Sequence, residues 1–379
     1  MTELAPTTLR EAVFDDGVEV YGLLRRLGLG VPSDPVAVNR TWARFWRDNP
    51  ALSADRPAPP IGWILESERR VVGFFGSIPL RYQLGDRPLV VGCASQWGVE
   101  KPFRGSTDQL ATAYFAQPNV DLLMVTTAIR ATGRIFERHG ASLMPQRDYD
   151  RVLYWVLDAR GFLAAALRKK NVRPELAAVG GLALSPLLAG VVALQRRSPG
   201  RASAGIEPDT VPLSGVGDEF DELWQAKLTE RPRLLAARAA SDLRWHFAPA
   251  EEKGKLIMVR CRRGGRLAGY LVLQREEIPT LGLVRAKIAD LLVAGDDPVI
   301  IDALLRAAVE ISRERGCHVL ELIGMPRAIR AQAERYRPFS RAFPCSPFHY
   351  KPTSPELGGK LVREDDWYPS LYDGDNCIG

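Results

Sequence analysis

VVGCASQWGVEKPFRGSTDQLATAYFAQPNVDLLMVTTAIRATGRIFERHGASLMP, from Val90 to Pro145, is the stretch that decides the fold. It continues a strand-like run that begins at Leu89 and ends at Val99. Apolar residues with helical spacing follow, then a second buried strand over residues 121–126, then a second helix that ends at Gly140. The stretch therefore predicts a strand–helix–strand–helix unit.

The first helix of this unit is expected to begin directly after Arg104 and Gly105. The first N–H groups of a helix have no intrahelical acceptor, and the helix dipole favours an anion at that end. A diphosphate can bind such a helix start through backbone N–H groups. The turn therefore predicts an anion site.

The order and spacing of this unit resemble the core of the GCN5-related N-acetyltransferase (GNAT) superfamily. In that family the strand and an Arg-Gly-rich turn hold the pyrophosphate of acetyl-CoA. The start of the chain, Thr8–Ala12 followed by an amphipathic segment to Leu27, is similar to the start of the same fold. The resemblance implies acetyl-CoA or another acyl-CoA as co-substrate, with no metal. It assigns cofactor binding to Val99, Arg104, Gly105, Ser106 and Thr107.

Three positions depart from the family pattern. The family prefers Gly, and then Gly or Ala, three and five residues after the arginine, where this chain has Thr107 and Gln109. The family also often places a general-acid tyrosine where this chain has Phe136, before the ending Glu137-Arg138-His139-Gly140. Phenylalanine cannot donate a proton, so these positions favour a degenerate module that binds without catalysis as an alternative.

The composition is ordinary for a soluble globular protein, with 46% hydrophobic and 25% charged residues. A length of 379 residues exceeds one typical core, so two domains are expected. The net charge of +6 suits CoA, an acidic glycan, lipid headgroups or nucleic acid, although Arg-rich genomes also drift basic. Five scattered cysteines without CxxC spacing favour a reducing cytoplasm over disulfides or zinc. Residues 1–9 lack a basic start and an apolar run, so no signal peptide is expected.

Residues 161–197 form an unusual segment in the middle of the chain. Basic residues surround an almost wholly apolar run from Leu176 to Leu194, which contains Pro186. Three interpretations compete: a bent helical pair packed against the domains, an interfacial membrane helix, and a membrane span. Residues 198–203 are expected to form a flexible linker.

The second half of the chain is expected to repeat the order of strands and helices of the first half. A hairpin over residues 256–274, a strand over 284–293, a helix to Arg315, a strand over 319–323 and a helix over 326–336 are expected. The fold class is therefore α/β, with two tandem GNAT-like domains, each a mixed, strongly twisted sheet with helices on both faces. The expected division is an N-terminal domain over 1–158, a helical insertion and linker over 159–206, and a C-terminal domain over 207–379. The second half has no turn of the CoA-binding type, so it is expected to share the fold but not the CoA site.

Tandem GNAT-like halves resemble the FemAB-type transferases and the acetyltransferase-like proteins found among bacterial cell-surface polysaccharide genes. Residues 242–245, 287–290 and 366–375 are similar to the second group. The resemblance implies a cytoplasmic acyl-CoA-dependent N-acyltransferase, with acetyl as the expected group, that acts on an amino sugar or glycan precursor near the inner membrane face. The alternative is a FemAB-like enzyme that uses aminoacyl-tRNA; otherwise no nucleic-acid partner is expected, because the basic residues are dispersed.

Acyl transfer to an amine needs a base for the amine and a donor for the thioester carbonyl. Glu100, at the end of the central strand, is the first candidate base, and a solvated turn carboxylate is its alternative. Asp373 and Asp375 are paired candidates in an aromatic tail, with a frayed terminus as the alternative. The candidate substrate-binding residues are Trp97, Arg244, Trp245, Trp367 and Tyr372. The four histidines do not cluster, so no metal site is predicted.

Overall fold

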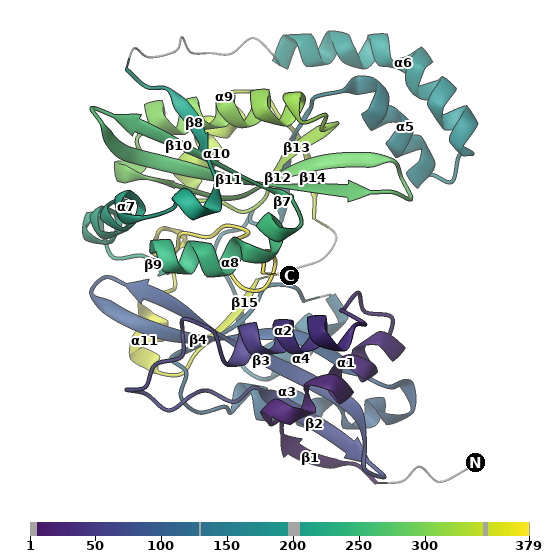
Figure 1. Cartoon of the computed structure of the whole chain (residues 1–379), viewed down its shortest axis with the longest axis vertical. Coiled ribbons are helices and arrows are strands. Elements are labelled where there is room, and N and C mark those ends of the chain that lie inside the picture. Colours follow the sequence, from purple (N-terminus) through teal and green to yellow (C-terminus); the bar gives the residue numbers. More distant parts are fainter. Residues whose placement is uncertain (1–5, 129, 196–204, 344–347, 379) are drawn as a thin grey trace.

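The computed structural model describes residues 6–128, 130–195, 205–343 and 348–378. Within them the chain forms two mixed β-sheets, one in each half of the molecule (Figure 1). The linker expected over residues 198–203 lies outside the described residues. The two sheets and their helices confirm the predicted α/β fold class.

The first sheet contains, in spatial order, β1 (Thr8–Glu11), β2 (Gly62–Ser67), β3 (Arg70–Leu84), β4 (Arg87–Val99), β5 (Leu122–Val125), β15 (His349–Pro352) and β6 (Ser142–Leu143). A further strand, β9 (Leu234–Ala236), pairs with the end of β3. The second sheet contains β8 (Pro208–Val211), β10 (Leu256–Arg263), β11 (Arg266–Ile278), β12 (Leu283–Val293), β13 (Val319–Leu322), β7 (Arg151–Val156) and β14 (Phe339–Ala342).

The two sheets have the same order and exchange one strand. In each, four antiparallel strands are followed by one parallel neighbour, β5 beside β4 and β13 beside β12. The next position is filled from the other half of the chain: β15 pairs with β5, and β7 pairs with β13. The sheets therefore do not divide at residue 158, although the domain boundaries themselves remain a prediction.

Helices cover the sheets on both faces (Figure 1). The longer helices are α1 (Gly17–Arg26), α2 (Pro35–Trp46), α3 (Thr107–Phe115), α4 (Arg130–Arg138), α5 (Ala159–Lys169), α6 (Pro174–Gln195), α7 (Asp218–Glu230), α8 (Ala240–Glu252), α9 (Pro298–Glu314), α10 (Arg327–Glu334) and α11 (Pro355–Gly359). The described residues also contain short 3-10 turns: η1 (Phe14–Asp16), η2 (Lys101–Ser106), η3 (Leu213–Gly215), η4 (Ala294–Asp296) and η5 (Glu364–Asp366).

Alternation along the strands creates two cores around the first sheet. Successive side chains of a strand point to opposite faces, so Ile64 and Phe74 join the core beneath α1 and α2. Their neighbours Leu65 and Phe75 join a smaller core beneath α3 and α4. The larger core continues into the second half of the chain, so the two halves share one interior.

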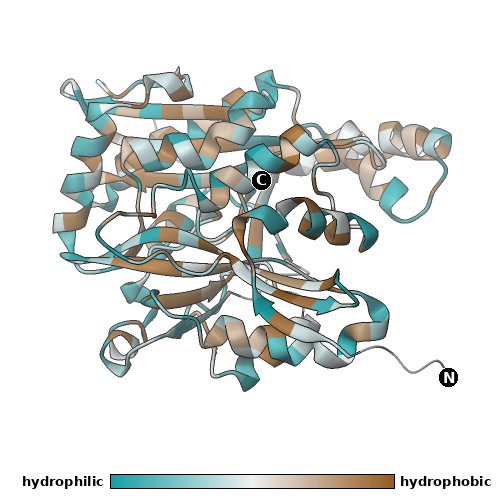
Figure 2. Ribbon diagram, turned by 60° about the horizontal axis from the view of Figure 1, so that its bottom comes forward, coloured by the Kyte–Doolittle hydropathy of each residue, from teal (hydrophilic) through white to brown (hydrophobic). Residues whose placement is uncertain are grey.

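The segment between the halves forms a helical pair, α5 and α6, which projects from the body of the molecule (Figures 1 and 2). Helix α6 continues through Pro186, which has no N–H to donate to the carbonyl of Leu182. The Ser185 hydroxyl donates to that carbonyl instead, at 2.8 Å. Among the described residues, no helix is long and apolar enough to cross a membrane.

Candidate active site

A cavity lies where β4 and β5 separate. The strands pair in parallel from Val91 and Leu122 to Cys93 and Met124, and β4 then continues alone on that side. The cavity measures about 350 Å³. Its walls are formed by Leu29, Phe75, Ala94, Ser95, Gln96, Trp97, Val125, Thr127, Ala128, Thr132 and Phe136. Ligands often bind beyond the carboxyl ends of parallel strands in open α/β sheets, which makes this cavity the candidate site.

A bulge in β4 shapes one wall of the cavity. Gly76 of β3 lies opposite Ser95 and Phe74 lies opposite Gly98, so two residues of β4 face a single residue of β3. Gln96 adopts a positive φ of 55° at this bulge, a conformation that is uncommon for a residue other than glycine. The bulge places Gln96 and Trp97 side by side in the cavity wall.

Two polar atoms in this wall have no partner among the described residues. Gln96 donates through Nε2 to the Tyr21 hydroxyl at 3.1 Å, but its Oε1 is buried without a donor. Trp97 stacks on Phe75 with 4.5 Å between ring centroids, and its Nε1 is buried without an acceptor. Since buried polar groups are normally paired, the cavity wall offers one acceptor and one donor to a ligand.

Asp375 approaches the cavity from the far end of the chain. Its Oδ1 accepts hydrogen bonds of 3.2 Å from Oγ1 of Thr126 and of Thr127. Burial raises the pKa of the Asp375 carboxyl above its usual value, and hydrogen bonds from the hydroxyls of Ser95, Thr127 and Thr126 offset this only in part. A carboxylate of raised pKa beside a cavity is a stronger base than an ordinary carboxylate and is a candidate proton acceptor.

Glu100 lies in a different electrostatic setting. Arg70 contacts both carboxylate oxygens at 2.9 and 2.8 Å, and Nε of Arg26 contacts Oε1 at 2.9 Å. Partial burial acts to raise the pKa of Glu100, but hydrogen bonds and charges from Arg70 and Arg26 outweigh it, so the pKa falls below the usual value. A carboxylate held by two guanidinium groups is a poor proton acceptor, which weighs against Glu100 as the base.

The five predicted cofactor-binding residues lie between the end of β4 and the start of α3. Val99 is the buried last residue of β4, and Arg104 and Gly105 are exposed within η2. The Ser106 hydroxyl lies 2.9 Å from that of Thr7, and the Thr107 hydroxyl donates to the Arg104 carbonyl at 2.7 Å. A Cβ at Gly105 would meet no atom within 4 Å. An exposed guanidinium, open space and a helix start fit a phosphate group.

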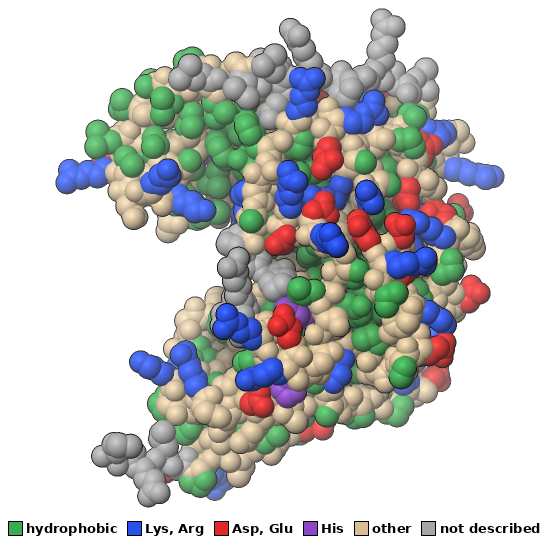
Figure 3. All heavy atoms as spheres, turned by 180° about the vertical axis from the view of Figure 1, so that it is seen from behind, with side chains coloured by type: hydrophobic (Ala, Val, Ile, Leu, Met, Phe, Trp, Pro, Cys, Tyr) green, Lys and Arg blue, Asp and Glu red, His purple; other side chains and the backbone are tan. Residues whose placement is uncertain are grey.

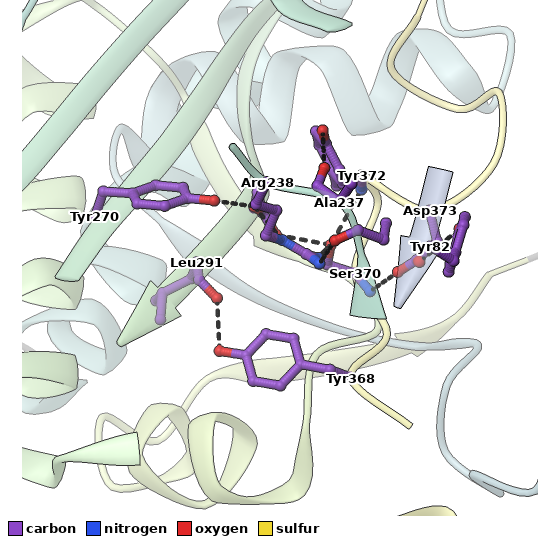
Figure 4. Close-up of polar contacts among 11 residues, drawn as sticks. Tyr82, Ala237, Arg238, Tyr270, Leu291, Tyr368, Ser370, Tyr372 and Asp373 are labelled. Atoms are coloured by element: carbon purple, nitrogen blue, oxygen red, sulfur yellow. Dashed lines mark hydrogen bonds and ion pairs between the residues drawn. The ribbon is translucent and has the colours of Figure 1, made fainter. Parts of the chain in front are cut away.

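Asp373 and Tyr372 belong to a buried network that joins the two halves (Figure 4). Arg238 donates to both oxygens of Asp290 at 2.9 and 3.0 Å, and both side chains are fully buried. The hydroxyls of Tyr270 and Ser370 each donate to Asp290 at 2.9 Å. Burial acts to lower the pKa of the Arg238 guanidinium, but Asp290 raises it well above its usual value.

The C-terminal segment is fixed by this network. Asp373 accepts hydrogen bonds from the Tyr82 hydroxyl at 2.8 Å and from the Ser370 N–H at 2.7 Å. Burial raises the pKa of the Asp373 carboxyl to about 6, against the opposing influence of Arg238. Tyr372 donates to the Ala237 carbonyl at 2.7 Å (Figure 4). These contacts place Asp375 beside the first sheet, so we interpret Asp373 and Tyr372 as positioning residues.

The remaining predicted substrate-binding residues lie in packing contacts. Trp367 is buried and donates to the Leu361 carbonyl at 2.9 Å. Arg244 donates to the Val216 carbonyl. Trp245 donates to the Arg44 carbonyl at 3.2 Å, and the Arg44 guanidinium lies 5.0 Å from its ring centroid. The structure therefore places Trp97 in the cavity wall and Asp375 in contact with Thr127 of that wall, and it keeps Arg244, Trp245 and Trp367 in other contacts.

Sequence reasoning missed the hydroxyl and amide residues around Asp375 and the bulge. Ser95 and Gln96 interrupt the apolar run of β4, and Thr126 and Thr127 directly follow the apolar strand β5. Polar residues that interrupt or end a buried strand were the available signal. Among the residues that the structure describes, no three His, Cys, Asp or Glu side chains gather in a way that would hold a metal ion.

Comparisons with solved structures support the fold. No protein-family model matches the sequence, and no curated protein matches it. The chain is similar to the crystal structure of a GCN5-related N-acetyltransferase from Anabaena variabilis, with a TM-score of 0.57 and 10% identity over 94% of this chain and 75% of the other. A GCN5-related N-acetyltransferase from Kribbella flavida gives a TM-score of 0.55 and 11% identity over 95% and 74%. A conserved protein of unknown function from Enterococcus faecalis, described as a probable N-acyltransferase, gives 0.57 and 6% over 94% and 74%. These likenesses show a GNAT-like fold.

Proposed function

We propose that this protein is an acyl-CoA-dependent N-acyltransferase whose reaction takes place in the cavity between β4 and β5. The observation that supports it most is the position of Asp375, a partly buried carboxylate of raised pKa that shares Ser95 and Thr127 with the cavity wall. An N-acyltransferase needs a base at the acceptor amine, and a carboxylate beside the cavity supports this role for Asp375. The GNAT-like fold is consistent with this chemistry but does not by itself establish it.

The acyl-CoA would bind across the turn between β4 and α3. Arg104 would pair with the pyrophosphate, and backbone N–H groups from Gly105 to Thr107 would complete the anion site. Val99, at the end of β4, would contact the adjacent part of the ligand. The acyl group, for which we propose acetyl, would then enter the cavity beside Trp97 and Gln96, whose unpaired polar atoms offer it hydrogen bonds.

In the proposed reaction Asp375 accepts a proton from the acceptor amine, directly or through a water molecule, as the amine attacks the thioester carbonyl. Backbone N–H groups on the unpaired edge of β4 would polarise that carbonyl. Phe136 lies in the cavity wall and cannot protonate the leaving thiolate. A free thiol has a pKa near 8.5, so the thiolate can take its proton from water instead.

The acceptor in this proposal is an amine such as an amino sugar or a cell-surface glycan precursor. An ammonium group would be attracted by Asp375, and the stacked rings of Trp97 and Phe75 offer an aromatic surface to a sugar. We place the reaction in the bacterial cytoplasm. Cys93, Cys261, Cys317 and Cys377 are all free thiols, as expected in a reducing compartment.

A non-catalytic module that binds a CoA-like ligand is the second candidate. Phe136 occupies the position of the family's general acid. Its ring centroid lies 5.3 Å from that of Trp97 and 5.7 Å from that of Phe115. The first turn of α3 also contains a carboxylate, Asp108, which pairs with Arg138 at 3.1 Å. A carboxylate there competes with an anionic ligand and weakens CoA binding under either candidate, so Phe136 is the observation that favours the second.

Calorimetric titration with acetyl-CoA and with CoA tests the proposal. Wild-type protein should bind both, and Arg104→Ala should weaken binding about tenfold or more, as expected for a lost charged hydrogen bond. Arg266→Ala is a matched control, because Arg266 is an exposed arginine in the hairpin turn of the second sheet. Release of free thiol with a panel of amino sugars then separates an enzyme from a binding module. No binding at millimolar ligand would refute the proposal and favour an aminoacyl-tRNA donor.

A further inference from the structure

One surface of the molecule has no role in the proposed reaction: the outer face of the α5–α6 pair. Helix α6 uses its small residues to pack closely on α5. A Cβ at Gly181 would lie 3.0 Å from the Arg160 carbonyl oxygen, so the two backbones nearly touch. Ala177, Gly181 and Val192 are buried on this inner face. Among the residues that the structure describes, none covers the opposite side of α6 in this way.

The outer face of α6 is apolar and exposed. Leu176, Val179 and Leu182 lie opposite Ala177 and Gly181 and have exposed fractions of 62%, 65% and 55%. Of the other large exposed apolar side chains in the described residues, four lie between Leu9 and Val18 and the rest are spread along the chain. Figure 3 shows apolar side chains gathered over the part of the molecule that projects beside the hollow between the halves. Patches of this kind usually mark a contact surface.

The same pair of helices is strongly basic. Between residues 159 and 195 the sequence contains five cationic side chains, Arg160, Arg168, Lys169, Lys170 and Arg173, and one carboxylate, Glu175. Lys169, Lys170 and Arg173 are exposed at the turn that joins α5 to α6. Basic side chains therefore lie directly beside the start of the apolar face, at Leu176. An occupant of this surface must combine apolar and anionic chemistry.

We infer that the α5–α6 pair docks on an anionic lipid bilayer, with the apolar face of α6 in the headgroup region and the basic turn against lipid phosphates. A bilayer offers both chemistries on one flat surface, because an exposed apolar surface can enter the headgroup region while neighbouring basic side chains contact lipid phosphates. The helix lies on the membrane and does not cross it, in agreement with the lack of a spanning helix among the described residues. This inference does not depend on acyl transfer.

Flotation with vesicles tests this contact in the absence of acyl-CoA. Full-length protein should float with vesicles of phosphatidylcholine and phosphatidylglycerol, and much less with phosphatidylcholine alone. Lys169→Glu with Lys170→Glu should lower the partition coefficient by about 25-fold or more, since each basic residue near the surface contributes about fivefold. Leu176→Ser with Leu182→Ser should lower it by about tenfold or more, because the apolar contact is lost.

Matched controls separate this surface from general effects of charge and hydrophobicity. Lys253→Glu with Lys255→Glu makes the same change in net charge at an exposed turn of the second half. Val36→Ser with Val362→Ser removes two exposed apolar side chains elsewhere. Both pairs should leave vesicle binding unchanged. Equal loss in the controls, no binding to anionic vesicles, or a dimer that the Leu176→Ser and Leu182→Ser variant converts to a monomer would each overturn the inference, the last in favour of a second copy of this chain.

Discussion

The two sheets have the same strand order, but they differ at the point where their parallel strands separate, which is between β4 and β5 in the first sheet and between β12 and β13 in the second. In the first sheet the end of β4 borders an open cavity. In the second sheet β12 continues beyond its last pair with β13, at Ile288, and its edge is occupied by the protein itself. The carbonyls of Leu291 and Val293 accept hydrogen bonds from the Tyr368 hydroxyl at 2.9 Å and from Lys227 Nζ at 2.6 Å.

The turns that follow these strands differ in the same way. After β12, the Asp296 carboxylate is held by Lys227 at 2.6 Å and by Arg233 at 2.8 Å, so the cations there already have an anion from the chain. After β4, Arg104 is exposed in an open turn. With the same fold, the space beside β12 is therefore occupied by side chains of the protein, whereas the space beside β4 is open to a ligand. We infer that only the first half binds CoA.

The strongest test of this relationship separates the halves. Residues 1–206 expressed alone would lack β15 and Asp375, and residues 207–379 alone would lack β7. Because each sheet would lose an inner strand and expose its hydrophobic neighbours, we expect neither fragment to fold as a soluble monomer. Circular dichroism and size-exclusion chromatography would check this, and co-expression should restore a complex. A fragment that melts cooperatively as a monomer would contradict the importance of strand exchange.

The second test removes the buried ion pair between Arg238 and Asp290, which holds the unpaired part of β12. Arg238→Met leaves Asp290 as an unpaired buried charge, which should lower the free energy of unfolding by about 3–5 kcal/mol. Arg238→Met combined with Asp290→Leu should recover much of this loss, because no isolated charge remains. Denaturant unfolding measures both, and Arg363→Met serves as a control, since Arg363 is 78% exposed in its pair with Asp366. A loss below about 1 kcal/mol would show that this network does not hold the halves together.

The third test concerns the open cavity. Asp375→Asn should lower kcat by about 100-fold or more with acyl-CoA binding retained, the effect expected for loss of a general base. Wild-type activity should rise with pH as Asp375 loses its proton, and the midpoint should lie above the usual carboxylate range because burial raises this pKa. The activity of Asp375→Asn should not show this rise with pH. Asp365→Asn, at an exposed carboxylate, is the control; full activity of Asp375→Asn would remove the base from the proposal.

The sequence was informative where structure is local. The run that ends at Val99, the hairpin of β10 and β11, and helix α9 were all predicted, because periodicity and turn residues specify them over short distances. The exchange of β7 and β15 was not, since a four-residue strand such as His349–Pro352 carries no sign of which sheet it joins. Asp375 was predicted from its neighbours in sequence, whereas Thr126 and Ser95 approach it only through tertiary contacts.

The smallest expected effect is that of Glu100→Gln, and it distinguishes Glu100 from Asp375, the two candidate carboxylates at the first sheet. Glu100→Gln should lower the free energy of unfolding at neutral pH by about 1 kcal/mol or less, because Arg26 and Arg70 are 45% and 53% exposed. The folded-state pKa of Glu100 is lowered, so its contribution is present above the unfolded-state pKa and should disappear as pH falls through the folded-state value. Thermal unfolding of both proteins from pH 3 to 7 checks this. Acyl transfer should stay within about threefold of wild type, since Glu100 takes no proton in the proposed reaction. If instead Glu100→Gln abolished turnover while Asp375→Asn did not, the roles of the two carboxylates would be reversed.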